Sequence, residues 1–272
     1  MHAAPAPRSE IFHSTTHTLV FSSFIGLSVA LFLSILIFLE LGRRIGIRAG
    51  NKDTPKGIGP LEAGIFSLLG LLIAFTFGGA TSRWETRRAL VVQETNDIGT
   101  AYLRLDLLLQ EDRVRLQALF KDYVRARLKV YAAAPDEEAV KREMAYVSAL
   151  QNSIWSNAVA ACKVEGSGTS TRLILPALNA MIDITTTRMM MTKTHPPKII
   201  FVLLYVLSLA AALIAGYGMA VNERRSWLHQ LGYALIMAGS VYVILEIEYP
   251  RAGLIRLDSH DQALVELVES WK

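Results

Sequence analysis

The sequence predicts an all-α membrane protein with four transmembrane helices and a helical soluble insertion between the second and the third. Three observations predict this class. The chain of 272 residues is 52% hydrophobic with a mean hydropathy of +0.33, which is too apolar for an ordinary soluble domain. The apolar residues gather in uncharged blocks of about the length that crosses a bilayer. The charged stretch between the second and third blocks has apolar residues at helical steps of three and four.

The first apolar block, residues 19–39, is long enough to span a membrane and follows a short N-terminal tail, residues 1–17. The tail contains a single arginine, and the block behind it exceeds the apolar core of a signal peptide. We therefore expect a retained anchor. A basic connector rich in glycine and proline then leads to the second block, so residues 18–80 hold the first two transmembrane helices.

The second block, residues 63–80, continues into a charged stretch without a helix-breaking residue. Beyond it, Val91, Ile98, Tyr102, Leu105 and Leu109 are separated by seven, four, three and four positions, which keeps them on one helical face. The pattern predicts one long helix that leaves the bilayer and enters water.

Residues 81–198 are predicted to form a helical insertion outside the membrane that continues this second helix. A break at residues 134–136 precedes a helix start at Asp136, because acidic residues suit the positive end of a helix dipole. Residues 165–168 are expected to end that helix, and His195 with the two prolines after it should stop the next one.

The third and fourth apolar blocks place two more transmembrane helices within residues 199–246. A tight turn at residues 222–226 makes them antiparallel neighbours. Glu246, Glu248 and Pro250 end the last span, and residues 247–272 form a C-terminal tail with one modest amphipathic turn.

The charge and motif content exclude several classes of function. A formal net charge of +4 comes from basic residues that flank apolar blocks, which indicates a membrane surface rather than nucleic acid. The single cysteine, Cys162, excludes an intrachain disulfide. No Ser/His/Asp set, HExxH or CxxC motif is present, and His13 and His17 lack a third ligand nearby. We expect no catalytic residues, no metal and no cofactor.

Two motifs carry a family resemblance. Residues 75–90, FTFGGATSRWETRRAL, with Asn96 beyond them, resemble the second helix of bacterial bestrophins. Residues 246–250, EIEYP, resemble the Glu-x-Glu-x-Pro that closes the last membrane helix of that family. Nearly the whole chain, including TSRWETRRALVVQETNDIGTAYLRLDLL and PRAGLIRLD, is similar to a bacterial family described as a bestrophin-like domain of unknown function.

The resemblance implies a bestrophin-like homopentameric ion channel in the bacterial inner membrane, with the insertion and both termini cytoplasmic. Its partners would be membrane lipid, further copies of the chain and inorganic ions. Carried over by position, the pore-lining rings are Phe75, Leu71 and Ser67. The residues at the pore mouth would be Arg83, Trp84, Glu85, Arg87 and Arg88, whose net positive charge suggests a weak anion preference. Ser67 departs from the family's apolar ring, and the acidic run that binds calcium in animal members is missing.

Structural roles remain open for the same residues. Leu71 and Phe75 would also suit a helix face packed on lipid, and the arginines could anchor the span and pair with Glu85 and Glu94. Glu246 and Glu248 are two positions apart and face different directions, so one could pair with an arginine while the other faces water. The alternative function is a non-conducting membrane scaffold or sensor that binds a partner through its insertion.

Overall fold

The computed structural model describes residues 8–49, 58–134, 136–163, 168–221, 227–250 and 258–271. All regular secondary structure in these ranges is helical, as the sequence predicts. The expected turn at residues 222–226 and most of the break at residues 165–168 lie outside the described residues, as do the side chains of His13 and His17.

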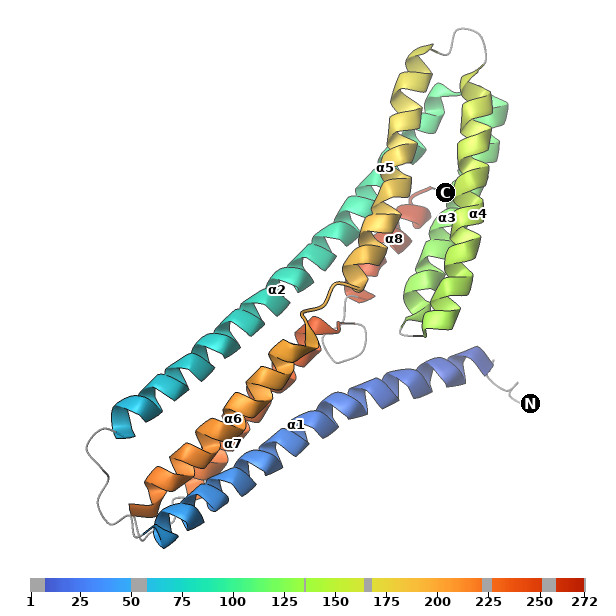
Figure 1. The fold of residues 1–272 in the computed structure, drawn as a ribbon. Coiled ribbons are helices and arrows are strands. Elements are labelled where there is room, and N and C mark those ends of the chain that lie inside the picture. Colours follow the sequence, from blue (N-terminus) through green and yellow to red (C-terminus); the bar gives the residue numbers. More distant parts are fainter. Residues whose placement is uncertain are drawn as a thin grey trace, which may run out of the picture. The chain divides into compact units, whose positions relative to one another are not determined.

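The helices follow one another along the chain without any strand between them in the described ranges (Figure 1). Their bounds are α1 Arg8–Arg48, α2 Ile58–Arg104, η1 Leu105–Leu107, α3 Gln110–Ala133, α4 Glu137–Cys162, α5 Gly168–Thr192, α6 Lys198–Gly218, η2 Met219–Val221, α7 Trp227–Glu248 and α8 Asp258–Glu269.

The chain divides into two compact units, and α2 contributes to both. Unit 1 comprises residues 1–18, 85–194 and 250–272, and unit 2 comprises residues 19–84 and 195–249. The continuous helix that the sequence predicts is therefore confirmed: α2 runs from the apolar block into the charged stretch without a break. It ends at Arg104, earlier than expected, and the exposed Leu109 precedes α3 rather than extending the buried stripe.

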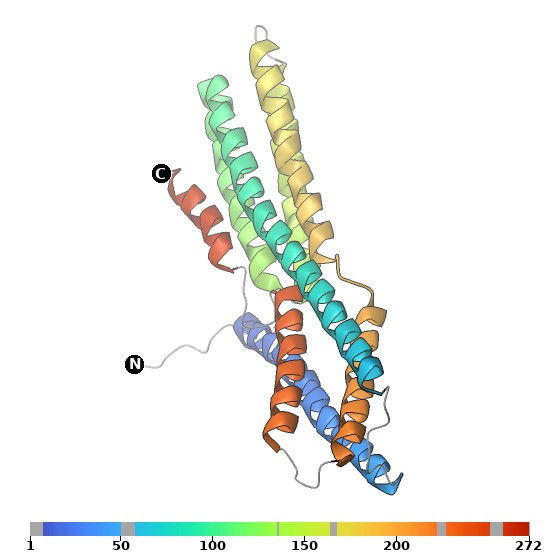
Figure 2. The same ribbon diagram turned by 90° about the vertical axis from the view of Figure 1, so that its left-hand side faces the viewer.

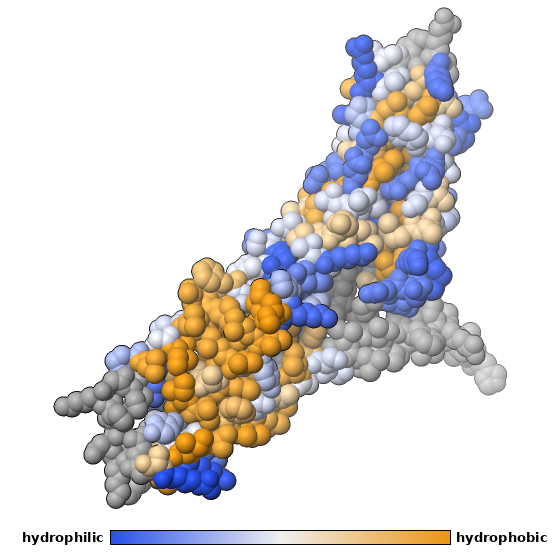
Figure 3. Space-filling model, in the orientation of Figure 1, coloured by the Kyte–Doolittle hydropathy of each residue, from blue (hydrophilic) through white to orange (hydrophobic). Residues whose placement is uncertain are grey.

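Four helices are long and apolar enough to cross a membrane, within Ser22–Arg48, Gly59–Leu107, Lys198–Gly218 and Trp227–Glu248. Hydrophobic residues gather on the surface over the parts of α2 and α6 that belong to unit 2 (Figure 3). Leu31 and Ile35 of α1, Leu69 of α2 and Leu204 of α6 form the core beneath them. These findings confirm the predicted class of an all-α membrane protein.

Glycines allow α1 and α6 to approach each other closely within unit 2. A Cβ atom at Gly216 would lie 2.0 Å from the backbone oxygen of Leu39, and one at Gly42 would lie 2.0 Å from that of Leu213. Gly46, one turn beyond Gly42, also faces α6. Gly42 and Gly46 form a GxxxG pattern, which lets membrane helices pack backbone against backbone. The structure thus uses these glycines for close packing.

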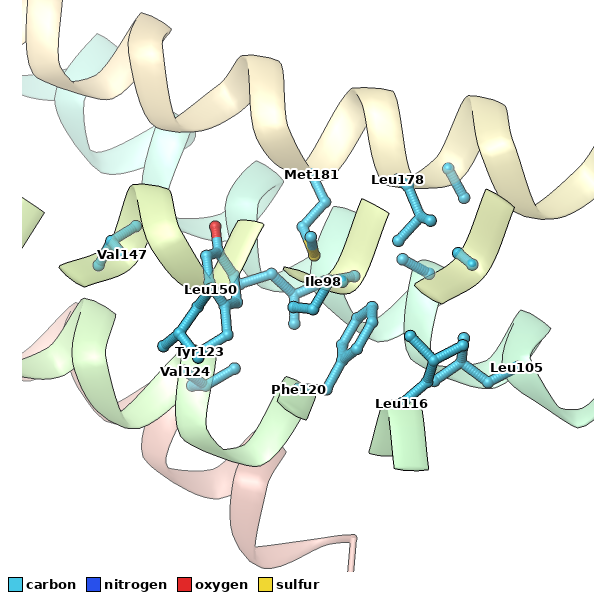
Figure 4. Close-up of a cluster of buried hydrophobic side chains, with 14 of the residues drawn as sticks. Ile98, Leu105, Leu116, Phe120, Tyr123, Val124, Val147, Leu150, Leu178 and Met181 are labelled. Carbon is cyan, nitrogen blue, oxygen red and sulfur yellow. The ribbon is translucent and has the colours of Figure 1, made fainter. Parts of the chain in front are cut away.

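Unit 1 is a helical bundle built by α3, α4, α5, α8 and the second half of α2 (Figures 1 and 2). Ile98 from α2, Phe120 and Tyr123 from α3, Leu150 from α4 and Met181 from α5 converge in its core (Figure 4). Asp136 caps α4 by accepting hydrogen bonds from the backbone N–H groups of Glu138 and Ala139, at 3.1 and 3.0 Å. This confirms the helix start predicted at Asp136.

Both ends of the chain are more helical than predicted. α1 begins at Arg8, so part of the expected tail is helical. The C-terminal tail contains a complete helix, α8, rather than a single amphipathic turn. Leu264 of α8 is fully buried, and Trp271 stacks on Tyr102 of α2 with ring centroids 3.8 Å apart.

Candidate pore helix and its anchors

Within a single chain, α2 leaves one side of its apolar half uncovered. Phe75 is 71% exposed and Leu71 is 52% exposed, and Ser67 is also exposed, one turn earlier. On the opposite side, Leu69 and Thr76 are buried against the chain's own helices. The positions carried over as pore-lining therefore share the face of α2 that the chain itself does not use.

Small residues extend this uncovered face. A Cβ atom at Gly64, Gly70 or Gly78 would meet no atom within 4 Å. No helix of the described chain therefore approaches these three glycines closely. Within the chain, the close approach occurs at Gly42 and Gly216 instead.

Arg83 forms an ion pair with Glu248 in unit 2. Its Nε and Nη2 atoms donate to the Glu248 carboxylate at 3.0 and 2.7 Å, and Glu248 is fully buried. His195 Nδ1 lies 2.9 Å from the other oxygen of this carboxylate, and its ring stacks on Tyr249. The pairing of Glu248 with an arginine is as the sequence suggested, and the partner is Arg83.

Arg87 points into unit 1 and is 6% exposed. Its Nη2 donates to the backbone oxygen of Thr194 at 2.9 Å, and its Nε donates to that of Met191 at 3.4 Å. Met191 lies in the last turn of α5 and Thr194 lies two residues beyond its end, where the helix dipole is negative. Arg87 therefore anchors the end of α5 to α2.

We expect the Arg87→Met variant, which keeps the apolar stem and removes the guanidinium, to lower the stability of unit 1 by about 1–3 kcal/mol, because the charge-assisted hydrogen bonds from this buried side chain to the end of α5 are lost. Hydrogen exchange at the amides of residues 188–192 should accelerate, because this last turn loses its anchor. The matched control is Arg88→Met, since Arg88 is exposed on the same helix. Equal exchange in both variants would contradict the anchoring role of Arg87.

The remaining mouth residues are less enclosed. Trp84 is half-buried, whereas Glu85 and Arg88 are exposed and of opposite charge. The positive charge of Arg83 is balanced by Glu248, and Arg87 faces inward. The potential that this segment presents to solvent is thus smaller than three arginines would suggest.

Glu246 differs from its expected placement. It is 2% exposed, so it does not face water beside Glu248. The physical reason is that this turn of α7 is covered by neighbouring helices: Ile244 and Leu245 are buried as well.

A buried charge network in unit 1 was missed by sequence reasoning. Glu94 of α2 accepts from Arg127 Nε and from the Tyr131 hydroxyl, both at 2.6 Å, and it also pairs with Arg188 of α5. Arg188 in turn reaches Asp261 of α8 at 3.4 Å. The pairing of Glu94 with Arg83, Arg87 or Arg88 that the sequence suggested is therefore wrong.

The network fixes the charge state of its members. Burial by itself raises the pKa of the Glu94 carboxyl, but the guanidiniums of Arg127 and Arg188 outweigh burial and hold this pKa below its ordinary value. Burial and the Glu94 charge together raise the pKa of Tyr131 well above its ordinary value. The carboxylate therefore stays ionised and the phenol stays protonated at neutral pH.

Within the described part of the chain, no group of three His, Cys, Asp or Glu side chains could hold a metal ion. Cys162 is buried in the unit 1 core. Near the end of the apolar half of α2, Arg83 takes part in an ion pair and Arg87 anchors the end of α5.

These features define an all-α protein with four membrane-compatible apolar helices, one of which extends into a separate helical bundle. The family model of the Bestrophin-like domain matches residues 26–261, most of the chain. The chain belongs to the Bestrophin-like domain family, as its motifs predict. No curated protein and no solved structure matches it.

Proposed function

We propose that this protein is a subunit of an oligomeric ion channel that passes small inorganic ions through a pore lined by α2. The observation that carries the proposal is the uncovered face of α2, with Ser67, Leu71 and Phe75 at steps of four. Apolar rings at such steps resist wetting in a narrow pore, so ions pass only when the rings part. Family membership supports the same reading.

The proposed assembly is a homopentamer in the bacterial inner membrane, with the four apolar helices as spans and unit 1 with both termini in the cytoplasm. A closed ring is required, because a pore on a symmetry axis needs each copy to present the same face. The proposed anion preference is weak: Arg88 adds positive charge at the exposed mouth, while Glu85 offsets it.

We expect Phe75→Ala and Leu71→Ala to raise ion flux in liposomes containing the purified protein. Each truncation removes an apolar ring, and every ~1.4 kcal/mol taken from the barrier raises the rate about tenfold. Leu235→Ala is the matched control, because Leu235 is 67% exposed on α7 and outside the proposed pore. A flux that is unchanged in the α2 variants, or raised equally in the control, would contradict the pore assignment.

The mass of the detergent-solubilised particle separates this proposal from the alternative, a non-conducting scaffold or sensor that binds a partner through unit 1. A pentamer that conducts supports the channel. A monomer or dimer without flux removes the pore, since neither can close a ring around an axis.

A further inference from the structure

α8 supplies a negative charge that the buried network in the rest of unit 1 requires. Glu94, Arg127 and Arg188 alone would carry one carboxylate against two guanidiniums. Asp261 of α8 supplies the second carboxylate. Because an uncompensated charge inside a protein is costly, an anion is required at the Arg188 end of the network.

The network loosens towards α8. The side chains of Glu94 and Arg127 are 0% exposed and 2.6 Å apart, whereas those of Arg188 and Asp261 are 7% and 12% exposed and 3.4 Å apart. The link to Asp261 is thus the longest and most accessible of these pairs. Among the carboxylates of the network, that of Asp261 is therefore the one that solvent or a dissolved anion can replace most easily.

Arg188 is held in place independently of α8. Glu94 pairs with its Nη1 atom, and its guanidinium carbon lies 4.0 Å from the Tyr131 ring centroid. These contacts leave Nη2 directed at Asp261. A guanidinium fixed in this way is a preorganised donor for a carboxylate or another oxyanion.

α8 itself is short. Isolated helices below about 12–15 residues are marginal in water, so α8 is ordered by its docking contacts. Those contacts include Asp261, the buried Leu264 and, just beyond the helix, Trp271 on Tyr102. Replacing Asp261 or Leu264 should therefore weaken the docking of α8 and leave Arg188 without the Asp261 carboxylate.

We propose that Asp261 acts as an internal, exchangeable anion on Arg188, and that a small free oxyanion of the phosphate class occupies this site when α8 is displaced. Unit 1 would then have two states, one with α8 docked and one with the oxyanion bound. This proposal is independent of whether the protein conducts ions.

The test uses the full-length protein in detergent, with inorganic phosphate as the probe and chloride at equal ionic strength as the reference. Asp261→Asn removes the charge, Leu264→Ala removes the apolar anchor and keeps Asp261, and Glu266→Gln is the control because Glu266 is exposed on α8. Hydrogen exchange of residues 258–269 reports docking. The thermal unfolding midpoint reports phosphate binding, since a ligand of the folded state raises it with concentration.

Both Asp261→Asn and Leu264→Ala should speed exchange in α8 by about tenfold or more, as expected for losing a charge-assisted or fully buried contact. Both should also gain a saturable, phosphate-dependent rise in the unfolding midpoint that Glu266→Gln and the unaltered protein lack. Faster exchange without this rise, or an equal rise in all four proteins, would overturn the proposal. Stabilisation by phosphatidylglycerol in nanodiscs, but not by free phosphate, would assign the site to a lipid headgroup and overturn the free anion.

Discussion

Replacing Glu94 with glutamine is expected to lower the free energy of unfolding of unit 1 by about 3–5 kcal/mol, the usual cost of removing one partner from a buried ion network. Glu94 is fully buried between Arg127 and Arg188, which keep their charges because the pKa of each is raised. The amide of glutamine keeps the shape but cannot neutralise two guanidiniums. The decrease in the free energy of unfolding is measured by denaturant unfolding of the full-length protein, with hydrogen exchange of the α3 amides as the probe of unit 1.

The pH dependence of this loss identifies its electrostatic origin. Because the folded-state pKa of Glu94 lies below its ordinary value of 4.5, its ionised form stabilises the fold fully above pH 4.5. The stabilisation disappears as the pH falls through the folded-state pKa. The difference between the original protein and Glu94→Gln should therefore be constant near neutrality and shrink below pH 4.5. The exposed Glu111→Gln variant should stay within about 0.5 kcal/mol throughout.

Replacing Gly216 with alanine is expected to destabilise unit 2 by about 1–3 kcal/mol or more, the range for overpacking a tight core. The added Cβ would lie 2.0 Å from the Leu39 backbone oxygen, and a backbone atom cannot turn aside as a side chain can. The α1–α6 crossing must therefore open, weakening contacts along it such as the 3.0 Å hydrogen bond between Ser34 and Tyr205. The unfolding midpoint in detergent measures the change.

The matched control is Gly239→Ala in α7, where the new Cβ would meet nothing within 4 Å. There, alanine should be neutral or stabilise the helix by roughly 0.5–1 kcal/mol, because it restricts the backbone more than glycine does. Equal destabilisation of both variants would show that glycine matters for backbone freedom rather than for close packing at the α1–α6 crossing.

The helical period was enough to predict α2 as one continuous helix and its buried face at Val91 and Ile98. The same period contained a signal for the buried network. Glu94 falls between Val91 and Ile98, and Arg127 falls four positions after Tyr123, so both occupy apolar stripes. A charged residue on an apolar stripe is unusual and indicates a buried partner. The helical period thus singles out Glu94 and Arg127 as buried charges, but it does not show which residues they pair with.

The partners could not be predicted because they are distant in the chain. Glu94 meets Arg188 across 94 positions, and Arg83 meets Glu248 across 165. Such pairings depend on how the helices pack in three dimensions. The predicted mouth illustrates this point: Arg83, Arg87 and Arg88 are near neighbours in sequence, yet only Arg88 is exposed. For the GxxxG pattern of Gly42 and Gly46, the sequence offers a signal but does not identify Gly216 as the opposing residue.

The division of unit 1 into separate chain segments affects how the protein is made. Residues 85–194 leave the ribosome before α6 and α7, and α8 with Asp261 and Leu264 leaves only after those two helices. Until then, the nascent bundle lacks the helix that balances Arg188 and covers its apolar face. Completion of this bundle therefore follows the synthesis of all four apolar helices, and a product cut short before residue 258 would contain these four helices but an unfinished core of unit 1.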